Sequence, residues 1–295
     1  MKKIYLILPI LSGILFGSSG IFIRILTQNG MDPATQLFSR FIISIFIMLI
    51  VILITDKNLL RVSLDELKLL IIASINIIAL NLCFTISTNT LPLSLAAILL
   101  NLAPVFVIVF AYIAFKEEIT KKKLIPMILI IIGCILTTGL LERNTLNISA
   151  IGVLAGIGTA FFWANYNVAS KKSVKEGTHS HTLLFYTTIL MTVMLIPFTD
   201  FSQITTFVNV DVGANGVFLI LNALLAFILP YVLLVESMNY IDVSSVAIFT
   251  AGAEPLSALL FGIILYGEIP TLLIFIGIII TIIAISTLSK NEYES

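Results

Sequence analysis

The sequence predicts an all-α, polytopic membrane protein with ten transmembrane helices, arranged as two inverted five-helix repeats with both termini in the cytoplasm. Composition supplies the first observation: the chain is 59% hydrophobic and only 11% charged, with a mean hydropathy of +1.14. A typical soluble domain is roughly 25% charged. The other two observations are ten long apolar runs and one segment that occurs twice.

The apolar runs have the length of membrane-spanning helices. A bilayer core of about 30 Å takes about 20 helical residues at about 1.5 Å each. The runs are continuous rather than alternating, which favours helices over barrel strands, because a helix satisfies its own backbone polar groups. The predicted spans cover residues 4–26, 34–54, 66–88, 93–115, 121–141, 149–171, 180–198, 215–236, 243–266 and 269–288.

The first two spans carry recognisable start signals. The chain opens MKKIY, the basic start of a signal peptide, but the apolar run then exceeds 20 residues without a small-residue cleavage pattern, so we expect a retained helix. Asp32 and Pro33 open the second span as an N-cap and a first helical residue. Connections are short, and the longest, residues 199–215, is too small for a soluble domain.

Basic residues predict the orientation. With a cytoplasmic N-terminus, Arg143 is the one basic residue in the outer connections. Thirteen basic residues then lie on the cytoplasmic side, as the positive-inside rule requires. They are Lys2, Lys3, Lys57, Arg61, Lys68, Lys116, Lys121, Lys122, Lys123, Lys171, Lys172, Lys175 and Lys290.

The repeated segment predicts the internal symmetry. Residues 94–120 and 245–271 share seven of 27 positions, and in both a proline precedes a glutamate by 13 residues. A second echo, at a shift of 147, places Phe16 over Trp163. Five spans per repeat is an odd number, so the two halves, residues 1–142 and 143–295, should be inverted. Inverted repeats are typical of secondary transporters.

These segments resemble EamA-type members of the drug/metabolite transporter superfamily over about residues 5–288. The motifs that carry the resemblance are Phe16-Gly17-Ser18, Phe38-Ser39-Arg40, Pro104 with Glu117, Ala253-Glu254-Pro255 and Tyr266-Gly267-Glu268. The resemblance implies a carrier of small metabolites, often an exporter of amino acids or related compounds. It also implies a central cavity lined by helices 1, 3, 4, 6, 8 and 9. Lys116 departs from the family pattern, which has glycine there.

Glu254 is the sharpest site candidate, because it lies about twelve residues into the ninth span. A charged side chain at the bilayer centre costs at least about 2.5 kcal/mol on insertion scales. Glu254 is either a protonatable coupling group, since burial disfavours the charged form, or a counter-charge for an amine. The structural alternative is a carboxylate hydrogen-bonded beside a kink at Pro255.

Further polar candidates, apart from Arg40, lie on the spans that the resemblance assigns to the cavity. Arg40, on the second span, either binds substrate, snorkels to the outer interface or pairs with a neighbour. The other candidates are Asn81, Thr85, Asn101, Trp163, Tyr166 and Asn167. Each of these either contacts substrate or forms a hydrogen bond between helices. Gly13 with Gly17, and Gly152 with Gly156, predict close helix packing.

We therefore expect a secondary active transporter that exports small polar metabolites across a prokaryotic plasma membrane by alternating access. A proton is a candidate coupling ion, the chain acts as a monomer or homodimer, and no metal, cofactor or nucleic acid is expected. The alternative is a multidrug or cation/proton antiporter that uses Glu254, or a passive channel. An intramembrane enzyme is disfavoured: Gly17-Ser18-Ser19-Gly20 fits a membrane serine protease, but both histidines, His179 and His181, lie near the other face.

Overall fold

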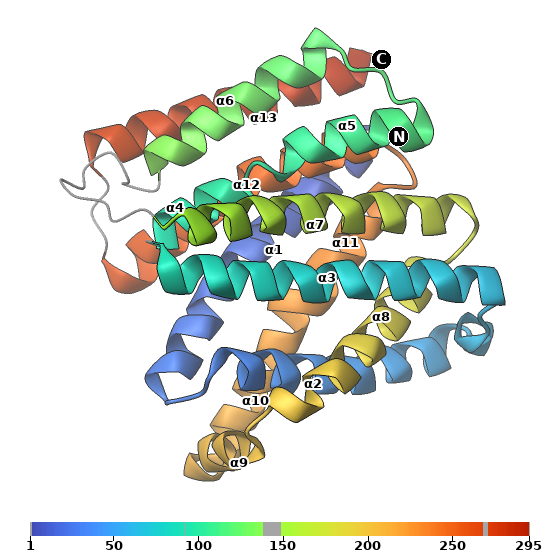
Figure 1. Cartoon of the computed structure of the whole chain (residues 1–295), viewed down its shortest axis with the longest axis vertical. Helices are drawn as coiled ribbons and strands as arrows, with labels where there is room; N and C mark the ends of the chain where they lie inside the picture. The colour runs from blue at the N-terminus through green and yellow to red at the C-terminus, as the bar shows by residue number, and fades with distance from the viewer. Residues whose placement is uncertain (1, 92, 138–148, 268–270, 295) are drawn as a thin grey trace.

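A computed structural model describes residues 2–91, 93–137, 149–267 and 271–294 (Figure 1). Arg143 and Glu268, which the orientation and repeat arguments use, lie outside these residues. Every regular element of the described ranges is helical, which confirms the all-α prediction.

The helices follow one another with short turns. In chain order they are α1 (Lys2–Gln28), α2 (Pro33–Thr55), η1 (Lys57–Leu60), α3 (Leu64–Thr90), α4 (Leu93–Leu100), α5 (Ala103–Phe115), α6 (Lys121–Thr137), α7 (Ala150–Lys175), α8 (Ser180–Leu195), η3 (Ile196–Phe198), α9 (Phe201–Val210), α10 (Val212–Ala223), η4 (Leu224–Ile228), α11 (Leu229–Ser237), α12 (Val243–Tyr266) and α13 (Leu272–Glu294).

Eight helical stretches within the described residues are long and apolar enough to cross a membrane. They are Tyr5–Gln28, Pro33–Thr55, Glu66–Thr90, Leu95–Phe115, Ser180–Phe198, Val212–Ser237, Val243–Leu265 and Leu272–Asn291. Many large apolar side chains on these helices are exposed, such as Ile54 and Ile264, which are 80% and 73% exposed. Lipid is the natural neighbour of such a surface. The chain is thus a multi-pass membrane protein. The predicted spans 121–141 and 149–171 correspond to α6 and α7, which are not among the eight, so ten spans remain a prediction.

Polar side chains fix several helix starts. Asp32 accepts hydrogen bonds from the Ala34 and Thr35 amides, and Pro33 occupies the first turn of α2, as predicted. Ser63 and Glu66 form a reciprocal capping box at the start of α3. Each cap satisfies amide groups that a helix start leaves unpaired.

The predicted span 93–115 is confirmed as the apolar stretch Leu95–Phe115, but its helix is interrupted at Asn101 and Leu102, between α4 and α5. Pro104 lies in the first turn of α5. Proline has no amide hydrogen, and its ring excludes the carbonyl four residues earlier, so the helical ladder stops just upstream. At the equivalent position of the second repeat, Pro255 lies inside a continuous α12.

Two further differences concern the second half. The predicted span 215–236 starts earlier, at Val212, and contains the π-helical segment η4. Pro230 follows this segment at the start of α11 and cannot donate the normal helical bond, which accounts for the altered spacing. The connection 199–215 is not irregular, because it contains α9. Asp200 and Asp211 cap α9 and α10, and both caps were missed as helix signals.

Helices at matching places in the two predicted halves make matching contacts. α1 packs against α12 and α11, while α7 packs against α4, α5 and α3 (Figure 1). α6 and α13 pack against each other, as do α2 and α8. The end of α5 reaches the start of α12, since Glu117 accepts hydrogen bonds from the Val243 and Ser244 amides. α5 and α12, the helices of the repeated segment, therefore run in opposite directions.

The same backbone turn ends both of these helices. Lys116 after α5 has φ +60°, and Gly267 after α12 has φ +63°. Lys116 is the one non-glycine residue with positive φ in the described chain. A left-handed residue commonly ends a helix, but it is costly for any side chain other than glycine. Lys116 thus adopts the same left-handed turn as Gly267.

Glycines bring the crossing helices into close contact, as predicted. A Cβ atom at Gly17 would lie 2.5 Å from the Glu254 carbonyl oxygen, and one at Gly13 would lie 2.7 Å from the Thr250 carbonyl oxygen. A Cβ atom at Gly156 would lie 2.4 Å from the side chain of Leu99. These distances leave no room for a side chain, so α1 is fixed against α12 and α7 against α4.

Candidate functional site

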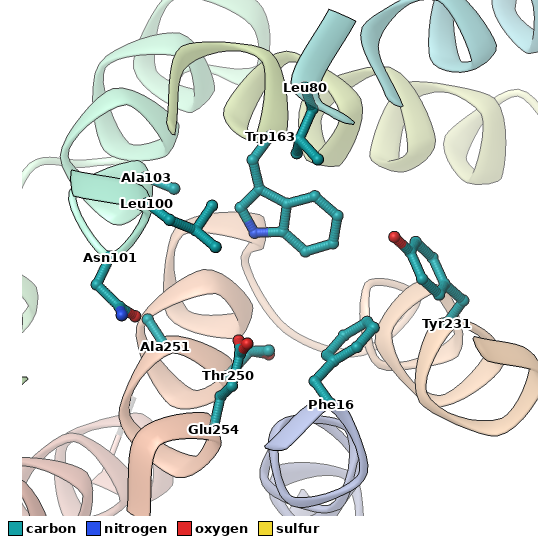
Figure 2. Close-up of a pocket in the computed structure, with 10 residues that line it drawn as sticks. All are labelled: Phe16, Leu80, Leu100, Asn101, Ala103, Trp163, Tyr231, Thr250, Ala251 and Glu254. Carbon is teal, nitrogen blue, oxygen red and sulfur yellow. The ribbon is translucent and has the colours of Figure 1, made fainter. Parts of the chain in front are cut away.

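A cavity of about 120 Å³ lies where six helical segments meet (Figure 2). One water needs roughly 10–15 Å³ on this measure, so the cavity has room for a small molecule. Its walls come from α1, α3, the α4–α5 break, α7, α11 and α12, which are the six helices that the family resemblance implied. The lining residues are Phe16, Leu80, Leu100, Asn101, Ala103, Trp163, Tyr231, Thr250, Ala251 and Glu254.

Glu254 supplies the one acidic group of this lining. Its carboxylate makes no hydrogen bond or ion pair with any other residue in the described part of the chain, and Figure 2 shows it on the cavity wall opposite Trp163. A carboxylate excluded from water needs a proton or a cationic partner. The cavity is where such a partner can reach it.

Aromatic rings form the wall opposite this carboxylate. The ring centroids of Phe16 and Tyr231 are 5.0 Å apart, and Trp163 meets both rings edge to face with centroids at 5.9 Å. Tyr166 stacks behind Trp163 at 5.4 Å. Aromatic faces attract cations, and they also stack on flat apolar groups. A carboxylate facing aromatic rings suits a ligand with a positive end and an apolar body.

Most lining residues pair across the two repeats. The shift of 147 that relates the first helices pairs Phe16 with Trp163, and these two rings touch. The shift of 151 pairs Leu80 with Tyr231, Leu100 with Ala251 and Ala103 with Glu254. Positions related by these shifts in the sequence therefore line the cavity together, but the positions that correspond to Tyr231 and Glu254 are apolar, Leu80 and Ala103. Its polar chemistry comes mainly from the second half.

The structure brings three predicted site residues to the cavity: Glu254, Asn101 and Trp163. Asn101 lies at the α4–α5 break, and its amide donates to the Ala97 carbonyl oxygen. Asn81 and Thr85 on α3 are not among the lining residues and bond carbonyl groups of their own helix.

The remaining predicted residues lie behind the cavity wall. Tyr166 is 1% exposed, and the Asn167 amide donates to the Trp163 carbonyl oxygen. Arg40 does not snorkel to the surface, since it is 7% exposed and its Nε donates to Asn222 Oδ1 at 3.0 Å. Tyr166, Asn167 and Arg40 therefore either support the residues that line the cavity or extend the site beyond the lining.

Sequence reasoning missed Phe16, Tyr231 and Thr250 as lining residues. The pairing of Phe16 with Trp163 across the repeats was a usable signal, because equivalent positions near a twofold axis approach each other. Tyr231 follows Pro230 at the start of α11, and its counterpart at the shift of 151 is the apolar Leu80, which gave no polar signal. The position of Tyr231 depends on the π-helical segment that precedes it.

A polar network closes the bundle at the end that carries the lysine clusters, here called the basic end. Glu117 receives hydrogen bonds from the Val243 amide at 3.0 Å and the Ser244 hydroxyl at 2.6 Å. Lys123 donates to Asp242 and to Ser244 Oγ. The side chains of Glu117 and Lys123 are 7% and 9% exposed, whereas that of Asp242, at the edge of the network, is 48% exposed. The network joins the start of α12 to the α5–α6 turn.

A second lysine holds the same end from the α7 side. The Lys171 ammonium donates to the carbonyl oxygens of Met238 and Ile241 in the turn between α11 and α12. Positive charge at exposed helix carbonyls is stabilising. Four helices that reach the cavity, α5, α7, α11 and α12, are thus tied together at the basic end.

The opposite end is held by neutral contacts and caps around α9. The Asp200 amide donates to Thr35 Oγ1, and the Asp32 amide donates to Gln203 Oε1. Hydrogen bonds from Ser202 lower the pKa of Asp200, an exposed residue that caps α9. These bonds attach α9 to the α1–α2 turn.

The protease alternative finds no support in these positions. His179 and His181 stack on each other at the α7–α8 turn with Nδ1 atoms 3.1 Å apart, at the basic end. Ser19 lies in the second half of α1, and the neighbouring Ser18 hydroxyl donates to the Leu15 carbonyl oxygen.

Comparisons with known proteins agree on one family. The sequence model of the EamA-like transporter family matches residues 3–139 and 150–290. The chain is 27% identical over 224 residues to the uncharacterized transporter YyaM of Bacillus subtilis, covering 73% of this chain and 72% of that one. It is 25% identical over 312 residues to an uncharacterized transporter of Clostridium kluyveri, covering 99% and 95%.

A solved crystal structure shares the fold with a TM-score of 0.80, at 14% identity and with 98% of each chain covered. The family match spans nearly the whole chain and both walls of the cavity. The chain therefore belongs to the EamA-like transporter family and is a membrane transporter.

Proposed function

We propose that this transporter is a secondary active exporter of small polar metabolites, such as amino acids or related compounds, and that it works by alternating access in a prokaryotic plasma membrane. The observation that carries the proposal is the cavity at Glu254, which is lined by residues from both predicted repeats. Alternating access requires a central site that faces one side at a time.

The proposed topology has ten spans in two inverted repeats, residues 1–142 and 143–295, with both termini cytoplasmic. The opposite directions of α5 and α12 support the inversion, as do the matching left-handed turns at Lys116 and Gly267. The family match in two stretches, on either side of residues 140–149, also supports two repeats. Tags inserted after residue 142 and after residue 290 should report opposite compartments. Finding both tags in one compartment would disprove the inversion.

Transport is tested with purified protein in proteoliposomes. A metabolite panel is first screened by thermal unfolding, because a ligand that binds only the folded state raises apparent stability. Each stabilising compound is then loaded inside and followed in counterflow and under an imposed pH gradient. Accumulation against a gradient supports a coupled carrier, whereas equilibration alone indicates a passive channel.

A second candidate function is favoured by one observation. The unpaired Glu254 carboxylate facing Trp163 and Tyr231 suits a hydrophobic cation that exchanges for a proton. In that case organic cations with aromatic groups, and not zwitterionic metabolites, should raise the thermal unfolding temperature in the compound screen. Efflux of such a cation should then be driven by an inward proton gradient.

A further inference from the structure

Arg40 is a buried cation whose guanidinium is only partly used. It lies seven residues into α2 and is 7% exposed. Nε donates to Asn222 Oδ1 at 3.0 Å, and the two terminal nitrogens make no hydrogen bond or ion pair with any residue in the described part of the chain. Removing an unpaired charge from water costs several kcal/mol per ion, so a partner for this group is expected.

Asn222 adds a second open donor beside it. The residue is fully buried, its Oδ1 is occupied by Arg40, and its Nδ2 has no hydrogen-bond partner among the described residues. Most buried polar groups are hydrogen-bonded, so an orphaned amide next to an unpaired guanidinium is informative. Asn222 also lies just before the π-helical segment η4, a type of irregularity frequent at functional sites.

The position adjoins the cavity through Tyr231. This tyrosine lines the cavity, and its ring packs on Phe227 with centroids 4.7 Å apart. Phe227, one turn earlier, contacts Phe41, the residue after Arg40, with ring centroids 4.7 Å apart. Arg40 on α2 and Glu254 on α12 carry opposite charges and form no ion pair with each other.

Building on the proposed transport function, we propose that Arg40 and Asn222 form a subsite that binds the carboxylate group of the transported molecule. The chemistry fits this group. The Nε edge of the guanidinium is taken by Asn222, which leaves the end with two terminal nitrogens. That end matches the two oxygens of a carboxylate in a bidentate arrangement. The rest of the molecule then extends along Tyr231 into the cavity.

The test uses matched compounds that lack either the carboxylate or the amine. Three sets are built on the alanine, leucine and phenylalanine side chains, and each contains the free amino acid, its amide and the acid without the amine. Binding to the purified full chain in lipid nanodiscs is measured by thermal unfolding titration. At least one set should bind the carboxylate members 10-fold or more tightly than the amide.

Two variants remove the subsite in different ways. Arg40→Gln removes the cation, and we expect it to erase the 10-fold preference. Asn222→Asp gives Arg40 a carboxylate within the protein, so the unliganded chain should unfold at the same or a higher temperature while the preference is lost. Arg61→Gln, at an exposed arginine after η1, is the matched control and should leave binding unchanged.

The outcomes separate this subsite from transport itself. Equal binding of amides and carboxylates by the wild type overturns the subsite, and so does a preference that survives in Arg40→Gln. The subsite is also overturned if no carboxylate compound binds. In that case counterflow of the amides still tests transport. The proposed function is contradicted only if that counterflow also fails.

Discussion

Replacing Glu254 by glutamine tests whether this carboxylate acts in transport or only in folding. Glutamine keeps the shape of the side chain and removes its charge. The carboxylate has no hydrogen bond to lose within the described chain, and a charge at mid-membrane costs at least about 2.5 kcal/mol on insertion scales. The variant should therefore unfold at the same or a higher temperature than the wild type.

The expected effect on transport is large. A hydrogen bond to a charged group contributes about 1.5–3 kcal/mol, which corresponds to about 10- to 150-fold in affinity. If Glu254 binds a substrate amine, the apparent affinity in Glu254→Gln falls by that factor. If Glu254 carries the coupling proton, exchange of substrate persists but the imposed pH gradient no longer drives accumulation. Both readouts come from flux in proteoliposomes, beside thermal unfolding of the same preparation.

Glu118→Gln is the matched control, because Glu118 is exposed in the turn after α5. It should change neither flux nor stability. The reasoning is refuted if Glu254→Gln transports with unchanged affinity and unchanged response to pH. It is also refuted if the variant unfolds well below the wild type, since Glu254 would then have a structural role.

Three further predictions follow from the packing. Gly17→Ala places a Cβ atom 2.5 Å from the α12 backbone, so it should cost about 1–3 kcal/mol of stability and reduce substrate flux. Gly20→Ala is the control, because no atom lies within 4 Å of its Cβ position, and it should behave as wild type in the same assays. Glu117→Gln removes the charge that caps α12, so hydrogen exchange of the first α12 amides should accelerate. Unchanged protection of these amides would show that Glu117 does not hold the start of α12. Lys116→Gly relieves the left-handed strain at φ +60° and should raise stability by about 0.5–1 kcal/mol in thermal unfolding. A destabilised variant would contradict the left-handed turn at Lys116.

The sequence predicted those parts of the fold that depend on local pattern. Long apolar runs form helices in lipid whatever they pack against, and Asp32 before Pro33 is a local cap, so these predictions were confirmed. Gly13 and Gly17 were also predictable as contact points, because only small residues let membrane helices approach closely. The break at Asn101 was missed although Pro104 was noted, since a proline can be tolerated inside a helix, as Pro255 is.

The candidate site was less accessible from sequence. Glu254 stood out because a charge inside an apolar run is costly wherever the helix faces. Asn81 and Asn101 looked alike as isolated amides, but only Asn101 reaches the cavity. The difference depends on how each helix is rotated about its axis, and that rotation follows from packing against several neighbours.

By itself the sequence determined a membrane protein of long helices, a duplicated segment, a family and a carboxylate inside an apolar run, because composition and spacing alone decide these. Only the tertiary structure decided which residues line the cavity, how Tyr231 and Phe16 meet Trp163, and that Arg40 meets Asn222 across 182 positions of chain. Contacts between distant helices have no local signature, since each arises from the shapes of two surfaces that meet only after folding.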